Sequence, residues 1–225
     1  INTINKPIII GFSGLPGSGK STLGFWIDSV ARELSLDIKV ISLDDFYLPG
    51  REMDFAMKGN PWNVPRGFPG SHSLDLLHQS LDTFLKTGVL NTPTFDKSLR
   101  DGKGDRSGWC ELQPQVLILE GWFVGCVPVS DLFKIDDLDD DLFHLPLSQS
   151  EKDYRTLIQQ SLLEYTKVWK KFHKIWHLKS SVFDNTILWK SQQEQEMIKV
   201  KGSGLKGKHL SDFIRMIQTA IPQRS

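Results

Sequence analysis

The feature that most constrains this chain is a glycine-rich octapeptide near its start. It fits the pattern G-x-x-x-x-G-K-[ST], and its residues are Gly14, Leu15, Pro16, Gly17, Ser18, Gly19, Lys20 and Ser21, followed by Thr22. The apolar stretch 8–12 precedes it and predicts a short buried strand. Apolar residues at 23, 26, 27, 30 and 34 follow at helical spacing. A strand, a glycine-rich turn and a helix form the context in which this motif cradles phosphate.

The residue types of this loop suit a nucleoside triphosphate. Glycines let the backbone curl so that successive N–H groups point at phosphate oxygens, and the following helix adds the positive end of its dipole. Lys20 can reach the β- and γ-phosphates, and the hydroxyl of Ser21 can ligate Mg²⁺. We therefore expect residues 14–22 to bind ATP, with Mg²⁺ as the accompanying metal.

The composition narrows the classes of partner. The chain has 225 residues, which fits one domain, and its 27 basic residues balance 27 acidic ones. A net charge of zero argues against a nucleic-acid surface, and no apolar run reaches membrane-spanning length. The two cysteines, Cys110 and Cys126, have neither a disulfide framework nor metal-ligand spacing. They predict reduced thiols in a reducing compartment such as the cytoplasm.

Further strands and helices alternate along the chain. Strands are expected at 38–43, 116–119 and 175–178, and helices at 74–86 (capped by Ser73), 151–174, 184–200 and 209–221. The stretches 48–72 and 93–110 are expected to be irregular, and the acidic run 136–141 to be a solvated loop. The alternation predicts an α/β three-layer fold, with a mostly parallel central sheet flanked by helices, in a single domain spanning 1–225.

Acidic residues follow two of the expected strands. Asp44 and Asp45 come after 38–43, and Glu120 comes directly after 116–119. Ligands of an open parallel sheet bind beyond the carboxyl ends of its strands, so these carboxylates should meet the glycine-rich loop. We assign Asp44 as the group that accepts a proton from an acceptor hydroxyl, and Ser21 and Glu120 to Mg²⁺, with Asp45 as a further candidate near the metal. If Asp44 is a metal ligand instead, Asp45 becomes the candidate base.

Cationic residues gather in the two stretches expected to be irregular. They are Arg66 in the first, and Lys97 and Arg106 in the second. Each alone would most simply be a solvated charge. Together, beside a phosphate-binding loop, they indicate a small anionic acceptor.

Six segments of the chain, taken in order, form a recognisable set: 14–22, 42–48, 66–72, 95–98, 104–106 and 119–125. This set resembles the D-glycerate 3-kinase family of plants, cyanobacteria and fungi, within the phosphoribulokinase, uridine kinase and pantothenate kinase group of P-loop kinases. The resemblance implies transfer of the γ-phosphoryl of ATP to the 3-hydroxyl of D-glycerate, in photorespiration. It implies Asp45, Tyr47, Arg66, His72, Lys97 and Arg106 as acceptor-binding residues. A plant or algal source would imply the plastid stroma.

The chain departs from the family pattern near its late tryptophan. The family tends to have arginines where this chain has Leu188 and Lys190. An arginine there would be a lid residue over the phosphates, and a lysine keeps the charge but loses the forked geometry.

Two other functions stay open at this point. One is a kinase for another small acceptor, such as a nucleoside or pantothenate, because the residues themselves carry no base-binding signature. The other is a regulator whose ATP site drives partner binding without phosphorylating a metabolite. The acceptor-pocket residues Asp44, Lys97 and Arg106 count against the regulator, because a switch needs no acceptor pocket.

Overall fold

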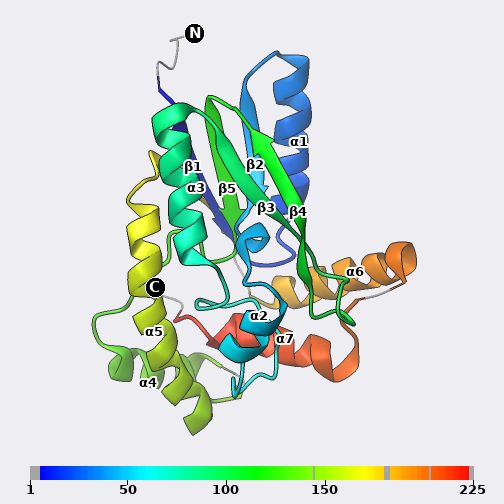
Figure 1. Ribbon diagram of the computed structural model, residues 1–225. Helices are drawn as coiled ribbons and strands as arrows, with labels where there is room; N and C mark the ends of the chain where they lie inside the picture. Colours follow the sequence, from blue (N-terminus) through cyan, green and yellow to red (C-terminus); the bar gives the residue numbers. More distant parts are fainter. Residues whose placement is uncertain (1–5, 144, 180–182, 203, 223–225) are drawn as a thin grey trace.

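The computed structural model describes residues 6–143, 145–179, 183–202 and 204–222, and its centre is a parallel sheet (Figure 1). Its strands lie in the order β2-β5-β1-β6. Their bounds are β1 (Ile8–Gly14), β2 (Ile38–Ser42), β5 (Val116–Gly121) and β6 (Lys174–Leu178). Every neighbouring pair is parallel, so the carboxyl ends of all these strands meet at one edge.

Helices cover both faces of this sheet. On one face α1 (Lys20–Glu33) packs closely, since a Cβ on its Gly24 would lie 3.0 Å from Val40. On the other face, α3 (Leu74–Thr87) and α5 (Gln149–Trp169) join a buried apolar cluster that includes Ile9, Leu117 and Leu119 of the sheet. The predicted α/β fold with a parallel sheet between helices is therefore confirmed.

The remaining elements surround the carboxyl edge of the sheet. They are the 3₁₀ helix η1 (Leu43–Phe46), α2 (Gly50–Ala56), β3 (Leu90–Asp96), β4 (Asp105–Leu112), α4 (Leu132–Leu142), α6 (Asp184–Lys201) and α7 (Gly207–Thr219). In Figure 1, α6 and α7 lie below this edge, and β3 and β4 run in front of β2. No helix in the described part of the chain is long and apolar enough to cross a membrane.

The expectation of an irregular stretch at 93–110 was wrong for residues 93–96 and 105–110, and only the turn at 97–104 is irregular. Residues 90–96 and 105–112 pair as an antiparallel two-stranded sheet, with Pro93 opposite Trp109 and a register shift after Thr94. Most side chains of β4 are at least partly exposed, so the strand lacks the apolar alternation that identifies a half-buried strand. Pro93 and the charged turn concealed the pattern further.

The connection 48–72 is only partly irregular. It contains α2, and a β-bridge between Tyr47 and His72 brings its ends together. Trp62, Val64 and Phe68 within it are buried in the main apolar cluster. This long connection is therefore part of the core and holds its ends at the sheet edge.

The acidic run 136–141 is helical, which corrects the expectation of a solvated loop. It lies in α4, where Asp136 and Asp139 are buried. Both form ion pairs with Arg155 of α5, at 2.9 and 2.5 Å, and the Arg155 side chain is fully buried. The sequence pattern missed this because the balancing charge lies sixteen or more residues away along the chain.

Candidate active site

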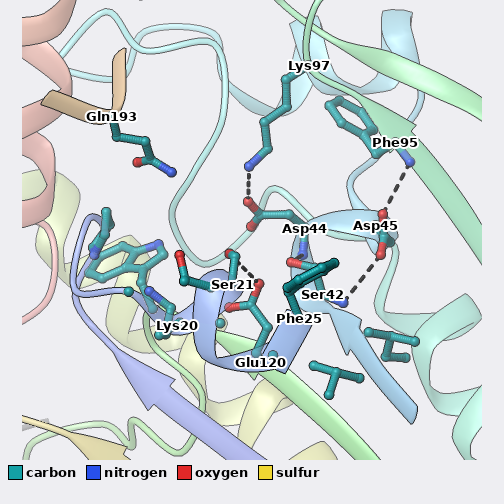
Figure 2. Close-up of a pocket in the computed structure, with 18 of the residues that line it drawn as sticks. Lys20, Ser21, Phe25, Ser42, Asp44, Asp45, Phe95, Lys97, Glu120 and Gln193 are labelled. Carbon is teal, nitrogen blue, oxygen red and sulfur yellow. Dashed lines mark hydrogen bonds and ion pairs between the residues drawn. The ribbon is translucent and has the colours of Figure 1, made fainter. Parts of the chain in front are cut away.

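A cleft of about 830 Å³ opens where the strands of the central sheet end. Figure 2 shows Lys97 beside Asp44, with Ser21 and Glu120 next to each other and Gln193 facing them from α6. Several parts of the fold line the cleft. Its residues include Gly17, Lys20, Ser21 and Thr22 of the loop and α1, Asp44 and Asp45 of η1, Glu120 of β5, Phe95 and Lys97 of the hairpin, and Trp189, Lys190 and Gln193 of α6.

The glycine-rich loop has the backbone that an anion cradle needs. Gly17 and Gly19 have φ values of 81° and 89°, a left-handed conformation that favours glycine. Helix α1 begins directly after Gly19 with no side-chain cap, so its first N–H groups are left for a ligand. The ammonium of Lys20 folds back over the loop and donates to the carbonyl of Leu15 at 3.0 Å. Burial lowers the pKa of Lys20, and the charges of Glu120 and Asp44 oppose that shift.

Ser21 and Glu120 form the second part of the site. The Ser21 hydroxyl donates to Glu120 Oε1 at 3.3 Å. Glu120 is buried at the end of β5, beside Ser42 in the parallel register, and burial raises its pKa while Lys20 opposes the rise. A hydroxyl and a carboxylate are hard oxygen donors, which fit Mg²⁺. The described residues hold no cluster of three or more His, Cys, Asp or Glu side chains that could bind a metal alone, so phosphate oxygens and water would complete the shell.

Asp44 and Lys97 form the third part. Lys97 Nζ lies 2.6 Å from Asp44 Oδ2, with the two side chains 50% and 26% exposed. Burial acts to raise the pKa of Asp44, but the charge and hydrogen bond of Lys97, helped by a hydrogen bond with Tyr47, hold it well below its usual range. The charge of Asp44 in turn raises the pKa of Lys97.

Asp45 has a different geometry from its neighbour. One oxygen accepts from the backbone N–H of Ser42 at 3.3 Å and the other from the N–H of Phe95 at 3.4 Å. Asp45 therefore caps η1 and ties it to β3, and burial raises its pKa.

The structure brings some predicted acceptor residues into the cleft and places others behind its wall. Asp45, Tyr47 and Lys97 line the cleft, whereas Arg66, His72 and Arg106 are not among the residues that line it.

The three residues behind the wall make fixed contacts. Arg66 donates to the carbonyls of Gly102 and Lys103 at 2.9 and 2.6 Å. Arg106 donates to Tyr47 O at 3.3 Å and to the hydroxyl of Ser73 at 2.7 Å, while Ser73, the residue before α3, makes no side-chain cap. His72 Nδ1 lies 2.8 Å from the Tyr165 hydroxyl. Burial lowers the pKa of His72 to about 4.

Helix α6 contributes residues that sequence reasoning mostly missed. The sequence indicates a lid position at Lys190, beside the late tryptophan Trp189, but predicts no role in the site for Trp189 or Gln193. The Lys190 ammonium lies 2.5 Å from Glu194 Oε1 and 3.2 Å from Gln193 Oε1, and burial lowers its pKa while Glu194 opposes this. Apart from the resemblance at Lys190, the pattern of this polar helix gives no sign that it reaches the glycine-rich loop.

Comparison with known proteins agrees with this geometry, although no family model matches the chain. The uncharacterized kinase mug58 of Schizosaccharomyces pombe is 28% identical over 97% of this chain and 80% of its own length. The chloroplastic D-glycerate 3-kinase of Arabidopsis thaliana is 30% identical over 92% of the chain, which spans only 45% of that enzyme. The solved D-glycerate 3-kinase of Cryptococcus neoformans superposes with a TM-score of 0.81 at 28% identity, covering 96% of this chain and 77% of that one.

The fold is that of the P-loop kinases. Within that class, the homologues of this chain include the D-glycerate 3-kinases. Kinase homology supports a phosphotransferase with a small-molecule substrate and implies the use of ATP.

Proposed function

We propose that this chain transfers the γ-phosphoryl of ATP to the 3-hydroxyl of D-glycerate. One observation carries the proposal: the loop lysine Lys20, the Ser21–Glu120 pair and the Asp44–Lys97 pair all face one cleft. These are the parts that phosphoryl transfer needs, namely a phosphate cradle, oxygen donors for a metal, a carboxylate base and a cation. The D-glycerate 3-kinases among the homologues favour this acceptor over the alternatives.

The donor side of the cleft would bind ATP. The N–H groups of the loop and of the first turn of α1 would hold the phosphates, and Lys20 would leave the Leu15 carbonyl to meet them. Ser21 and Glu120 would hold Mg²⁺, which when bound neutralises charge on the phosphates. Thr22 also lines the cleft at the start of α1.

The acceptor side would supply the base. The 3-hydroxyl oxygen of the acceptor attacks the γ-phosphorus, the bond from that phosphorus to the β–γ bridging oxygen breaks, and ADP leaves. The hydroxyl proton passes to the Asp44 carboxylate. Lys97 is the cleft-lining cation beside Asp44, so it would meet the acceptor's carboxylate.

A coupled assay of ADP release tests the proposal. The acceptors are D-glycerate, uridine, pantothenate and ribulose 5-phosphate, with L-glycerate as the matched control for stereochemistry. We expect ADP release to depend on D-glycerate and to be accompanied by one equivalent of 3-phosphoglycerate. Faster turnover of another acceptor would identify that compound, rather than D-glycerate, as the substrate. ATP binding without acceptor-dependent release of ADP would favour a regulator.

A further inference from the structure

The described part of the chain gives the Lys97 ammonium one hydrogen bond, and its acceptor is the candidate base. This ammonium lies 2.6 Å from Asp44 Oδ2, and within the described part of the chain no other group accepts a hydrogen bond from it. Half of the Lys97 side chain is exposed, at the start of the turn that joins β3 to β4. The lysine is therefore free to move while its turn stays in place.

The neighbouring cations are held in a different way. Arg66 donates to the two carbonyls of Gly102 and Lys103, which anchors the turn itself. Arg106 donates to the Tyr47 carbonyl and to the Ser73 hydroxyl. Breaking the contacts of Arg106 would leave the carbonyl of buried Tyr47 and the hydroxyl of half-buried Ser73 without that donor. Moving Lys97 unpairs no backbone group, and the carboxylate that it leaves is Asp44, which the acceptor hydroxyl would then meet.

The resting ion pair has a chemical consequence. A carboxylate that accepts a short hydrogen bond from an ammonium is a weaker proton acceptor, because protonating it would sacrifice the pair. Tyr47 adds a second hydrogen bond to the same carboxylate. In the state that the structure shows, Asp44 is poorly suited to activate any hydroxyl, including that of water.

We propose that Lys97 is an anion-operated restraint on Asp44: the negative group of the acceptor takes the Lys97 ammonium, and this exchange releases the Asp44 carboxylate to accept the hydroxyl proton. The inference rests on the proposed kinase function and makes it more specific. It assigns the acceptor to hydroxy compounds whose anionic group can reach the Lys97 ammonium while the reacting hydroxyl meets Asp44. It also makes Lys97 a specificity-determining residue that acts on turnover as well as on binding.

The exchange keeps the charges balanced at each step. Before binding, one ammonium neutralises one carboxylate of the protein. After binding, the same ammonium neutralises the acceptor's anionic group, and Asp44 gains the proton that the acceptor hydroxyl loses as its oxygen attacks the γ-phosphorus. A neutral acceptor offers nothing in exchange for Lys97, so Asp44 stays restrained. Water is excluded as an acceptor in the same way, which would limit wasteful hydrolysis of ATP.

Acceptors that differ only in charge test this directly. D-glycerate is compared with glycerol, and pantothenate with pantothenol, because each pair replaces a carboxylate by a hydroxymethyl group. For whichever anion the protein phosphorylates, we expect kcat with the neutral partner to be lower by about 100-fold or more, the scale of losing a general base. A loss confined to KM, or efficient phosphorylation of neutral uridine, would overturn the inference.

Two variants distinguish a Lys97 that restrains Asp44 from a Lys97 that stabilises the transferring phosphoryl or the fold. Lys97→Met removes the charge and keeps the length, and Lys103→Met makes the same change at an exposed lysine of the same turn. We expect Lys97→Met to lower kcat/KM for the anion but to raise kcat for its neutral partner roughly tenfold or more, while Lys103→Met changes neither. If Lys97→Met lowers kcat for both partners equally, Lys97 stabilises the transferring phosphoryl or the fold, and the inference fails. Thermal melting and ATP titration establish that both variants are folded.

Failure of D-glycerate as the acceptor can be distinguished from failure of the role inferred for Lys97. Turnover of pantothenate but not of glycerate would reject the proposed acceptor, and the pantothenate–pantothenol pair would still decide the role of Lys97. If no acceptor is phosphorylated, the proposed function fails, and the rate of acceptor-free ATP hydrolysis then tests whether Lys97 restrains Asp44. It should rise in Lys97→Met and return to the original rate when Asp44→Asn is added. An unchanged rate in Lys97→Met would overturn the inference.

Discussion

A Cβ placed on Gly17 would lie 2.8 Å from the backbone nitrogen of Lys190. The start of α6 is therefore seated directly on the glycine-rich loop, and its Trp189 and Lys190 form one wall of the ATP side of the cleft. This contact is between backbones, so a change at Gly17 cannot be absorbed by a side-chain rotation.

We expect Gly17→Ala to displace α6 and to weaken ATP binding. Its φ of 81° adds strain of roughly 1–3 kcal/mol for a residue with a side chain. Gly19→Ala is the matched control, because Gly19 has φ 89° but nothing lies within 4 Å of its Cβ position. ATP titration and thermal melting should show a larger loss for Gly17→Ala. Equal losses would mean that strain alone matters and that α6 does not support the loop.

Lys20→Ala should abolish turnover with every acceptor. The ammonium is buried at the loop and rests 3.0 Å from Leu15 O, where it can transfer to the phosphates. The measurement is ADP release at saturating ATP and Mg²⁺, with circular dichroism as the check on folding. A rate equal to that of the unmodified chain would remove the loop lysine from the mechanism.

Asp44→Asn should lower kcat by on the order of 10²–10⁴ and leave ATP affinity nearly unchanged, because the amide keeps the shape but cannot take a proton. Asp45→Asn is the comparison, since Asp45 is occupied by the N–H groups of Ser42 and Phe95. We expect it to lower kcat far less than Asp44→Asn does. If ATP affinity collapses in Asp44→Asn while the saturated rate survives, Asp44 is a metal ligand and Asp45 becomes the candidate base.

Much of the fold could be predicted because its signals are local. The strand, loop and helix around 8–33 follow from one motif and its flanks, and the apolar run 116–119 identifies a strand that is buried on both faces. The hairpin of β3 and β4 could not be predicted, because the side chains of β4 are all at least partly exposed and β3 is placed by contacts with α3 and with η1, which is distant in sequence. The apolar positions of α1 predicted the helix correctly, yet Trp26 on it and Leu34 directly after its end are 60% and 63% exposed.

The candidate site, too, could be predicted only in part. Strand ends in a parallel sheet converge by topology, so Ser21, Asp44 and Glu120 could be placed together from their positions alone. The partner of each charge could not be predicted, because it depends on side-chain reach across elements. Arg66 and Arg106 were expected to bind an anion, and the structure shows both donating to groups of the protein instead. Their roles toward an acceptor, like the single-domain organisation, stay predictions.

Arg106 should act on the acceptor through Tyr47. Its guanidinium joins the Tyr47 carbonyl to the Ser73 hydroxyl before α3, so it sets the position of a residue that lines the cleft. We expect Arg106→Ala to raise KM for D-glycerate much more than KM for ATP and to lower the melting temperature. Arg106→Lys should recover little, because a single ammonium cannot serve both acceptors with the fork's geometry. A similar rise in both KM values would mean that Arg106 supports the fold as a whole rather than the acceptor side of the cleft.

Glu151 should make the stability of the fold depend on acidic pH. This carboxylate begins α5 and accepts hydrogen bonds from Arg215 at 2.7 and 2.8 Å and from the indole of Trp62 at 3.0 Å, which ties α5 to α7 and to the connection after α2. Burial acts to raise its pKa, but the hydrogen bonds from Arg215 and Ser148 lower it to about 2. Because the folded state lowers the pKa, the stabilisation is complete above the ordinary value of 4.5 and is lost as the pH falls towards 2.

Urea unfolding of the chain and of Glu151→Gln at pH 5.5, 4.5, 3.5 and 2.5 measures this contribution. We expect the stability difference between the two proteins to shrink by about 3 kcal/mol across that range, since each pKa unit corresponds to about 1.4 kcal/mol. Glu164→Gln is the control on the same helix, because Glu164 is exposed and pairs with Lys167 at the surface. Its stability difference should stay near zero at every pH. A Glu151→Gln difference that does not change with pH would mean that the carboxylate acts through packing and neutral hydrogen bonds rather than through its charge.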